Sequence, residues 1–191
     1  MDRFTLYTDG YAATNPGRGG YGCIVLDVNR NILNQICGGK VHTTSNRMEI
    51  MGVLEGLKSI DTPSNIVVIS DSQYVVNTIN LWLKKWVAKG FEDKKNTDLW
   101  KEIWELMKKH NVQARWVKGH NGDKFNELAD RLAYKGGQEV LTDDNGYNPE
   151  DDLKVYTYKK PAKKKAFTNY SKLNRDSSAL NKRFDRLSRY D

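Results

Sequence analysis

The run Ile66-Val67-Val68-Ile69 restricts the fold more than any other part of the sequence, because its four consecutive apolar residues have the length of a short strand. A strand that is apolar on both sides must be covered on both faces, as in the middle of an α/β sheet. The flanking sequence offers such cover, since apolar side chains recur at helical spacing in residues 45–60 and 97–109. We therefore predict a central strand here, within a sheet that helices cover.

Other strand-like segments come before and after this run. Residues 3–9 alternate apolar and polar side chains, and residues 21–28 and 31–37 are separated only by Asn29-Arg30, which predicts an antiparallel meander. A further short strand is predicted at residues 112–117. The other expected elements are a loop at 15–20, helices at 72–80 and 81–89, and a last helix at 123–135 that Gly136-Gly137 ends. The order predicts an α/β fold with a mixed sheet flanked by helices.

The composition indicates a folded protein without a membrane span. Apolar residues make up 38% of the 191 residues, which excludes wholesale disorder. No run of 18 apolar residues occurs, and Met1 leads almost directly into a strand, so we expect neither a transmembrane helix nor a secretory signal. Cys23 and Cys37 lie on neighbouring strand candidates; a cross-strand disulfide is conceivable, but we expect two reduced thiols in a cytoplasmic protein.

The positive charge is concentrated at the C-terminal end. Residues 1–152 hold 19 Lys and Arg against 21 Asp and Glu, whereas residues 153–191 hold 12 Lys and Arg against 3 Asp. We therefore predict a folded domain at 1–140, an acidic linker at 141–152, and a basic, largely disordered tail at 153–191. The tail is either a solubilising extension, an anchor on nucleic acid, or a docking segment for an acidic protein.

Four carboxylates fall at positions where a fold of this kind can bring them together. Asp9 ends the first strand and Asp71 follows the central strand, and ligands commonly bind beyond the carboxyl ends of such strands. Glu49 lies on a helix beside a small, apolar stripe that can press closely onto the sheet, which turns the carboxylate inward. Asp130 lies on the last helix beside an apolar surface. We predict that the four acids converge.

Converging carboxylates need a counter-charge. Each pair at ~5 Å repels by roughly 3 kcal/mol at an effective dielectric of 20, so the cluster must bind protons or cations. Oxygen ligands suit Mg²⁺ or Mn²⁺, and one or two such ions can drive phosphodiester hydrolysis. Taken singly, each acid also has an ordinary interpretation: Asp9 in a turn, Glu49 in a capping box with Asn46, Asp71 as a helix N-cap, and Asp130 as a solvated helix residue.

The motifs around these acids occur in an order that is similar to that of the type 1 ribonuclease H family, from residue 3 to about residue 138. The matching segments are Thr8-Asp9-Gly10, Asn15-Pro16-Gly17, Thr43-Thr44-Ser45-Asn46-Arg47-Met48-Glu49, Ser70-Asp71-Ser72-Gln73-Tyr74-Val75, Asp98-Leu99-Trp100, Trp116-Val117-Lys118-Gly119-His120 and Asn126-Glu127-Leu128-Ala129-Asp130. The resemblance implies a ribonuclease H-like fold with a five-stranded mixed sheet. It also implies endonucleolytic hydrolysis of the RNA strand of RNA–DNA hybrids, leaving 3′-hydroxyl and 5′-phosphate ends.

The resemblance also assigns roles to individual residues. Asp9, Glu49, Asp71 and Asp130 match the metal-binding acids, and His120 matches a loop histidine that assists proton transfer or product release, although by sequence alone it is equally a surface residue. The residues that match contacts to the hybrid are Gly10, Asn15, Asn46 and Gln73 in the minor groove, Thr44 in a DNA-phosphate pocket, and Trp82, Lys84, Lys85 and Trp86 in a basic protrusion.

Two departures and two alternatives accompany this resemblance. Tyr11 and Ser45 stand where the family often has Ser and Asn, which bears on RNA contacts more than on metal binding. In the protrusion, Trp82 and Trp86 also suit a partly buried role beside solvated lysines. The whole chain could instead be a hybrid-binding module without catalysis, or a junction resolvase or integrase on the same scaffold. We expect a monomer whose substrate is an RNA–DNA hybrid.

Overall fold

The computed structural model describes residues 1–139 and 141–150. The predicted basic tail, including a weak helical pattern near residues 178–190, lies outside the described residues. Within the described part of the chain, no helix is both long enough and apolar enough to cross a membrane.

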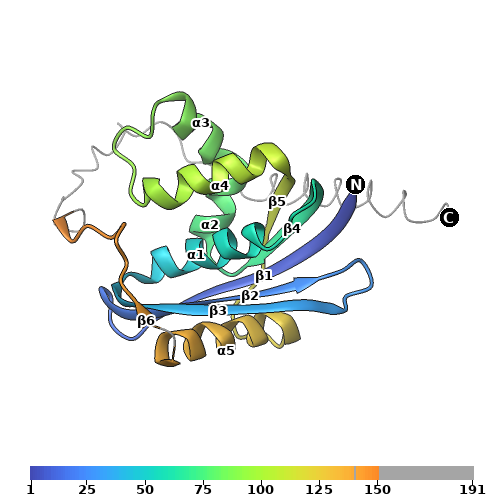
Figure 1. Cartoon of the computed structure of the whole chain (residues 1–191), viewed down its shortest axis with the longest axis horizontal. Coiled ribbons are helices and arrows are strands. Elements are labelled where there is room, and N and C mark those ends of the chain that lie inside the picture. The colour runs from blue at the N-terminus through green and yellow to red at the C-terminus, as the bar shows by residue number, and fades with distance from the viewer. Residues whose placement is uncertain (140, 151–191) are drawn as a thin grey trace, which may run out of the picture. The chain divides into compact units, whose positions relative to one another are not determined.

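The described residues form one sheet with helices on both faces (Figure 1). The strands are β1 (Asp2–Ala12), β2 (Gly17–Leu26), β3 (Ile32–Thr43), β4 (Ser64–Ser70), β5 (Asn111–Trp116) and β6 (Leu141–Thr142), and their order across the sheet is β5-β4-β1-β2-β3-β6. The helices are α1 (Ser45–Lys58), α2 (Gln73–Asn77), the π-helical turn η1 (Thr78–Trp82), α3 (Leu83–Ala88), α4 (Thr97–Lys109) and α5 (Lys124–Glu139). The predicted α/β class, with three antiparallel strands first, is confirmed.

The pairing of the strands makes the sheet mixed. β1, β2 and β3 form the expected antiparallel meander, and β1, β4 and β5 are parallel to one another. Figure 1 shows α1, α2 and α4 over one face and α5 under the other. Alternate residues of the central strand serve both faces, since Ile66 and Val68 join the core below α1 whereas Val67 and Ile69 pack toward α5. This confirms that the apolar run is covered on both sides.

The glycine-rich segment at 15–20 was predicted as a loop, but β2 already begins at Gly17. The reason is close packing against α5. A Cβ at Gly20 or Gly22 would collide with the backbone of α5 at Ala133 and Ala129. These glycines therefore mark the strand that lies nearest to a helix, and not a turn.

The same packing explains why Gly136-Gly137 does not end the last helix, which continues to Glu139. Gly136 lies against the backbone of Gly38, and a Cβ on Gly136 would collide with that strand. Gly137 lies next to Gly19 and Gly20 in the same way. Small residues on both partners let α5 lie directly on the sheet. The pair Gly136-Gly137 therefore marks a contact between helix and sheet, and not the end of the helix.

The two helices predicted at 72–80 and 81–89 are one interrupted helical segment. α2 runs into the π-helical turn η1, and α3 follows without a break. A side-chain hydrogen bond lies inside the segment, because the hydroxyl of Thr78 donates to the carbonyl of Tyr74 at 2.7 Å. The turn shifts the helical phase, so that α3 lies outside α4, away from the sheet (Figure 1).

Residues 141–150, expected to be part of an acidic linker, pack against the body. β6 adds a sixth strand parallel to β3, beyond the five that were expected. The side chain of Asp144 is buried and forms an ion pair with Arg47. The acidic residues suggested a solvated linker, but this one supplies a counter-charge to a buried arginine. Residues 151 and 152 of the predicted linker lie outside the described residues. Cys23 and Cys37 are free thiols, as expected.

Candidate active site

The register of the sheet brings Asp9 and Asp71 to the same place. Tyr7 of β1 pairs with Ile69 of β4 in parallel, and both side chains pack toward α5. Asp9 and Asp71 come two residues after this pair, and they therefore reach the same edge of the sheet on the same side. The strand-end position inferred from sequence becomes a neighbouring pair because of this register.

Glu49 reaches the pair from α1, on the opposite face, because small residues allow α1 to lie very close to the sheet. A Cβ on Gly10 would collide with the backbone of Met48 and Glu49. One and two turns further along α1, Gly52 lies against the carbonyl of Gly22 and Gly56 against the sulfur of Cys23. The predicted close contact is confirmed, and Gly10 has a packing role of its own beside Glu49.

The carboxylates of Asp9, Glu49 and Asp71 form a compact group. One oxygen from each lies within 4.8 Å of the others. The backbone N–H of Gly10 donates to Oδ1 of Asp9 at 2.7 Å, whereas Oε2 of Glu49 is buried and has no hydrogen-bond partner in the described part of the chain. A residue that has a buried, unpartnered carboxylate oxygen and lies beside two other acids is suited to a hard cation.

Asp130 adjoins this group from α5. It interacts electrostatically with Asp9 and shares a side-chain hydrogen bond with it. It is half-buried, and it lies on the helix that covers the face toward which Asp9 points. The structure thus brings all four predicted acids together, three as a tight group and Asp130 beside Asp9. We call these four residues the carboxylate cluster.

Burial and mutual repulsion change the proton affinity of the cluster. Burial, followed by the charge of Asp71 and then that of Asp130, raises the pKa of Asp9 to about 7. Burial, followed by the charges of Asp9 and Asp71, raises the pKa of Glu49 well above its ordinary value. Without a cation the cluster therefore holds protons near neutral pH, which is the behaviour expected of a site built for positive charge.

The ordinary interpretations of the acids fail at the helix ends. Thr44 caps α1, since its hydroxyl accepts the N–H of Arg47, and Ser72 caps α2, since its hydroxyl accepts the N–H of Val75. Asn46 is therefore not the N-cap that a capping box with Glu49 would need, and Asp71 is not the N-cap of α2. β1 continues to Ala12, so Asp9 does not lie in a turn either.

His120 lies in an exposed loop that passes next to the cluster. Trp116 donates from Nε1 to the carbonyl of Asp71 at 2.8 Å, and a Cβ on Gly119 would collide with Oδ2 of Asp71. His120 follows directly, with a left-handed φ of 49°, and Gly122 has a φ of 80°. The loop holds its glycine against Asp71 and leaves the imidazole in solvent.

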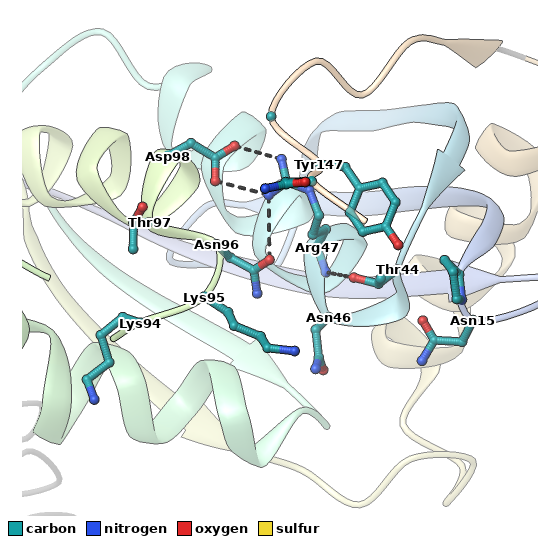
Figure 2. Close-up of a pocket in the computed structure, with 13 residues that line it drawn as sticks. Asn15, Thr44, Asn46, Arg47, Lys94, Lys95, Asn96, Thr97, Asp98 and Tyr147 are labelled. Carbon is teal, nitrogen blue, oxygen red and sulfur yellow. Dashed lines mark hydrogen bonds and ion pairs between the residues drawn. The ribbon is translucent and has the colours of Figure 1, made fainter. Parts of the chain in front are cut away.

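A second feature, the polar pocket, lies beside α1 and has a volume of about 390 Å³. The predicted contact residues Asn15, Thr44 and Asn46 line it, and Asn15 accepts the backbone N–H of Ser45 at 3.2 Å. Figure 2 shows Thr44, Asn15 and Tyr147 on one side and the lysines Lys94 and Lys95 on the other. The pocket thus combines small polar groups with two lysines opposite them, next to the paired Arg47 and Asp98.

The sequence interpretation missed most of the other pocket residues. These are Lys94, Lys95, Asn96, Tyr147 and Asn148. Lys94-Lys95-Asn96 precede α4 in a loop with several left-handed residues, and only the paired lysines gave a signal. The last two belong to the segment predicted as a linker, so no sequence pattern connected them with Thr44.

The basic protrusion contains both expected kinds of side chain. Trp82 and Trp86 stack with ring centres 6.1 Å apart, and Trp86 packs edge-on against the fully buried Trp100. Lys84 and Lys85 are exposed. The protrusion is therefore anchored through one tryptophan and presents the other with the lysines. Gln73, the first residue of α2, is exposed, two residues after Asp71.

Comparisons with known proteins agree with this geometry. The RNase H family model matches residues 1–138. The chain is 44% identical over 138 residues to the ribonuclease H of Sulfurovum sp. (strain NBC37-1), covering 72% of this chain and 92% of the relative, and 44% identical over 133 residues to the ribonuclease HI of Helicobacter pylori, covering 70% and 92%.

Two solved structures share the fold. LC9-RNase H1, described as a type 1 RNase H with the type 2 active-site motif, has a TM-score of 0.67 and 26% identity over 82% of each chain. The solution structure of the PFV RNase H domain has a TM-score of 0.62 and 28% identity, covering 73% of this chain and 96% of that domain. The match to the family model ends before the basic tail.

Proposed function

The chain belongs to the RNase H family, and from this premise we propose how its residues carry out the reaction. Members of this family are hydrolases that cleave the RNA strand of RNA–DNA hybrids endonucleolytically, with divalent metal ions, and this chain is such an enzyme. The observation that supports the assignment of roles is the carboxylate cluster, in which oxygens of three acids of like charge lie within 4.8 Å of one another.

The carboxylate cluster fits a divalent cation. Its ligands are hard oxygens, one of them buried and unpartnered, and its raised pKa values reflect unbalanced negative charge. Asp9, Glu49 and Asp71 would hold the ion, with Asp130 beside Asp9 as a fourth ligand or as a ligand to a second ion. Mg²⁺ is the ion we propose, with Mn²⁺ as a substitute, because carboxylate sites completed by phosphate oxygens suit both. A bound cation lowers the pKa of the attacking water and stabilises the leaving oxygen.

The other residues bind the hybrid and move protons. Asn46 and Gln73, with the closely packed Gly10, face the minor groove, where the 2′-hydroxyls identify the RNA strand. The polar pocket takes a phosphate of the DNA strand between Thr44 and the lysines. The protrusion with Trp82, Lys84, Lys85 and Trp86 contacts the DNA backbone further along.

His120 is the mobile proton carrier in this proposal. Its loop is anchored at Gly119 against Asp71 while the imidazole stays in solvent, so the ring can approach the reacting phosphate and leave again. Imidazoles exchange protons near neutral pH, which suits protonation of the departing 3′ oxygen. The hydrolysis leaves 3′-hydroxyl and 5′-phosphate ends.

The decisive experiment is Asp9→Asn, assayed on an RNA–DNA hybrid with Mg²⁺. Cleavage should fall at least about a hundred-fold, because losing an essential ligand costs several kcal/mol of transition-state stabilisation, while hybrid binding and the folded structure persist. Asp61→Asn, which changes an exposed acid away from the cluster, is the control and should cleave like the wild type. If Asp9→Asn keeps more than a hundredth of the activity, the metal assignment is wrong.

Product analysis separates this function from its alternatives. The wild type should cut the RNA of a hybrid with Mg²⁺ or Mn²⁺ and leave duplex RNA and duplex DNA intact. Cleavage of branched duplex DNA would instead indicate a resolvase, and tight hybrid binding without cleavage in any metal would indicate a binding module.

We also propose that the basic tail anchors the enzyme on nucleic acid. Its support is the division of charge, since residues 153–191 carry a net +9 and the remainder a net −2. Deletion of the tail should weaken hybrid binding and reduce the salt dependence by roughly 0.7–0.9 in the log–log slope per lost phosphate contact. An unchanged slope would contradict the anchor, and capture of an acidic protein by the tail would favour a docking role.

A further inference from the structure

Residues 141–150, which we call the strap, connect the edge of the sheet with the polar pocket. Its first two residues pair with β3, and Nζ of Lys40 donates to Oγ1 of Thr142 and to the carbonyl of Asp143, both at 3.0 Å. Further along, Gly146, Tyr147 and Asn148 line the pocket. The first residues of the strap are therefore held at the sheet, and its later residues line the pocket that also contains Thr44, a predicted substrate contact.

Arg47 holds the middle of the strap with two of its donors and links it to Asp98 and Asn96 with the other three. Nε and Nη2 donate to the two oxygens of Asp144, both at 2.8 Å, and Nη1 and Nη2 donate to the two oxygens of Asp98 at 3.0 and 2.7 Å. The remaining N–H of Nη1 points to Oδ1 of Asn96 at 3.5 Å. Arg47 is 2% exposed and the side chain of Asp144 3%, so this pair is shielded from water, whereas the side chain of Asp98 is 39% exposed.

Two further contacts make the position of the strap specific. The hydroxyl of Thr43 donates to Oδ2 of Asp144 at 2.6 Å, and Thr43 directly precedes Thr44 of the pocket. Gly146 lies so close to the Arg47–Asp98 pair that a Cβ would collide with Oδ2 of Asp98. The strap thus rests on the ion pair itself, and the pair sets the distance between the strap and α1.

The pocket wall that the strap supplies consists of hydrogen-bonding groups on a supported backbone. The ring of Tyr147 packs edge-on against His42 with centres 5.3 Å apart. Oδ1 of Asn148 accepts the backbone N–H of Glu150 at 3.1 Å, which fixes the orientation of the amide. Figure 2 shows Tyr147 next to Arg47 and Thr44, across from the lysines. Tyrosine and asparagine side chains are common donors to phosphate oxygens.

We propose that the strap is a substrate-binding element: Tyr147 and Asn148 hold a backbone phosphate of the DNA strand, and Arg47 positions them. This rests on the proposed function, because the phosphate belongs to the hybrid. Lys94 and Lys95 supply the long-range attraction, and the strap supplies directed donors. Because phosphate contacts fix the register of a protein on its duplex, the strap determines how tightly and where the hybrid lies, and leaves the chemistry at the carboxylate cluster unchanged.

The test compares a double variant with a control on the same strap. Tyr147→Phe with Asn148→Ala removes a hydroxyl and an amide but keeps the ring that packs on His42. KM for a hybrid should rise at least about tenfold, because the loss of even one hydrogen bond to a charged group has an effect of this size, while kcat stays within about twofold. Asn145→Ala, exposed and outside the pocket, should change neither value.

A substrate series identifies the group that the strap holds. Phosphates of the DNA strand are replaced one at a time by uncharged methylphosphonate. At the position held in the pocket, the replacement should lower the affinity of the wild type and abolish the difference between the wild type and the double variant. At all other positions, the tenfold difference between the two proteins should persist. A difference that persists at every position would overturn the proposal.

The positioning role of Arg47 is read from non-additivity. Asp144→Asn weakens the link to the strap but leaves the Arg47–Asp98 pair, and it should raise KM without lowering kcat. Added to the double variant, it should raise KM no further, because the wall that it positions is already lost. Additive effects, an unchanged KM, or an equal effect of Asn145→Ala would each overturn the proposal. A wild type that fails to cleave hybrids would overturn the proposed function instead.

Discussion

Helix α1 helps to bury two groups of charged residues. One is the carboxylate cluster, and the other is the Arg47 network, which comprises Arg47, Asp98 and Asp144. Arg47 and Glu49 are only two residues apart on α1. In the Arg47 network each donor meets an acceptor, and burial is compensated within the fold. In the carboxylate cluster three acids meet one another, and an oxygen of Glu49 has no partner among the described residues.

The difference separates structure from function. Charges that the fold compensates stabilise one arrangement of chain segments, and removing one partner leaves the others unpaired. Charges that the fold leaves uncompensated attract a counter-charge from outside the chain, in this case a cation. Four variants test this comparison, beginning with the largest expected effect.

Glu49→Gln should abolish activity without unfolding the protein. The amide cannot replace the carboxylate as a ligand, so kcat/KM on a hybrid with Mg²⁺ should fall about a thousand-fold, equivalent to ~4 kcal/mol. Circular dichroism should show an intact fold. The exposed Glu105→Gln on α4 is the matched control. An active Glu49→Gln enzyme would contradict the functional side of the comparison.

Arg47→Met should have its main effect on stability. The variant leaves Asp98 and the buried Asp144 without their counter-charge, so the free energy of unfolding by urea should fall by about 3–5 kcal/mol. Lys58→Met removes a cation from two more exposed pairs, with Glu55 and Glu102, and should cost less than about 1 kcal/mol. Similar losses in the two variants would mean that the Arg47 network does not stabilise the fold.

Asp9→Asn should stabilise the metal-free protein. It removes repulsion of about 2–3 kcal/mol from the cluster, so the melting temperature in EDTA should rise. The pKa of Asp9 is raised from 3.8 to about 7, so the folded protein keeps a proton that the unfolded chain releases. Wild-type stability in EDTA should therefore decrease from about pH 4 to pH 7.

The same variant should flatten this pH dependence, and Mg²⁺ should stabilise the wild type more than the variant. A metal-free Asp9→Asn protein that is less stable than the wild type at pH 7 would show that the cluster is compensated after all.

Asp144→Asn should show the opposite pH dependence with a smaller effect. Burial acts to raise the pKa of Asp144, but the hydrogen bonds from Arg47 and Thr43 outweigh it and the pKa is lowered. The stability due to the charge is thus present above the unfolded pKa of 3.8 and is lost as the pH falls through the folded pKa. At pH 7 the variant should be about 2 kcal/mol less stable, and the two urea curves should converge under acid conditions. A constant difference at all pH values would exclude an ionic role.

The sequence was sufficient for the parts of the fold that depend on local pattern. The apolar run at Ile66–Ile69, the meander of the first three strands and α4 were predicted because period and turn residues act over a few positions. The strand-end acids were predicted for the same reason. The glycine pairs at 19–20 and 136–137 were misread, since a glycine that permits a turn and a glycine that permits a helix to touch a strand look alike in sequence.

The chain by itself determined which residue types were available: acids at strand ends, small residues on α1, and a basic C-terminal end. The tertiary structure alone decided which charges face one another. The pairing of Tyr7 with Ile69 placed Asp71 beside Asp9, and the return of the strap placed Asp144 on Arg47, 97 residues away. Electrostatic energy depends on distance in space, which follows from strand register and helix packing and not from separation along the chain.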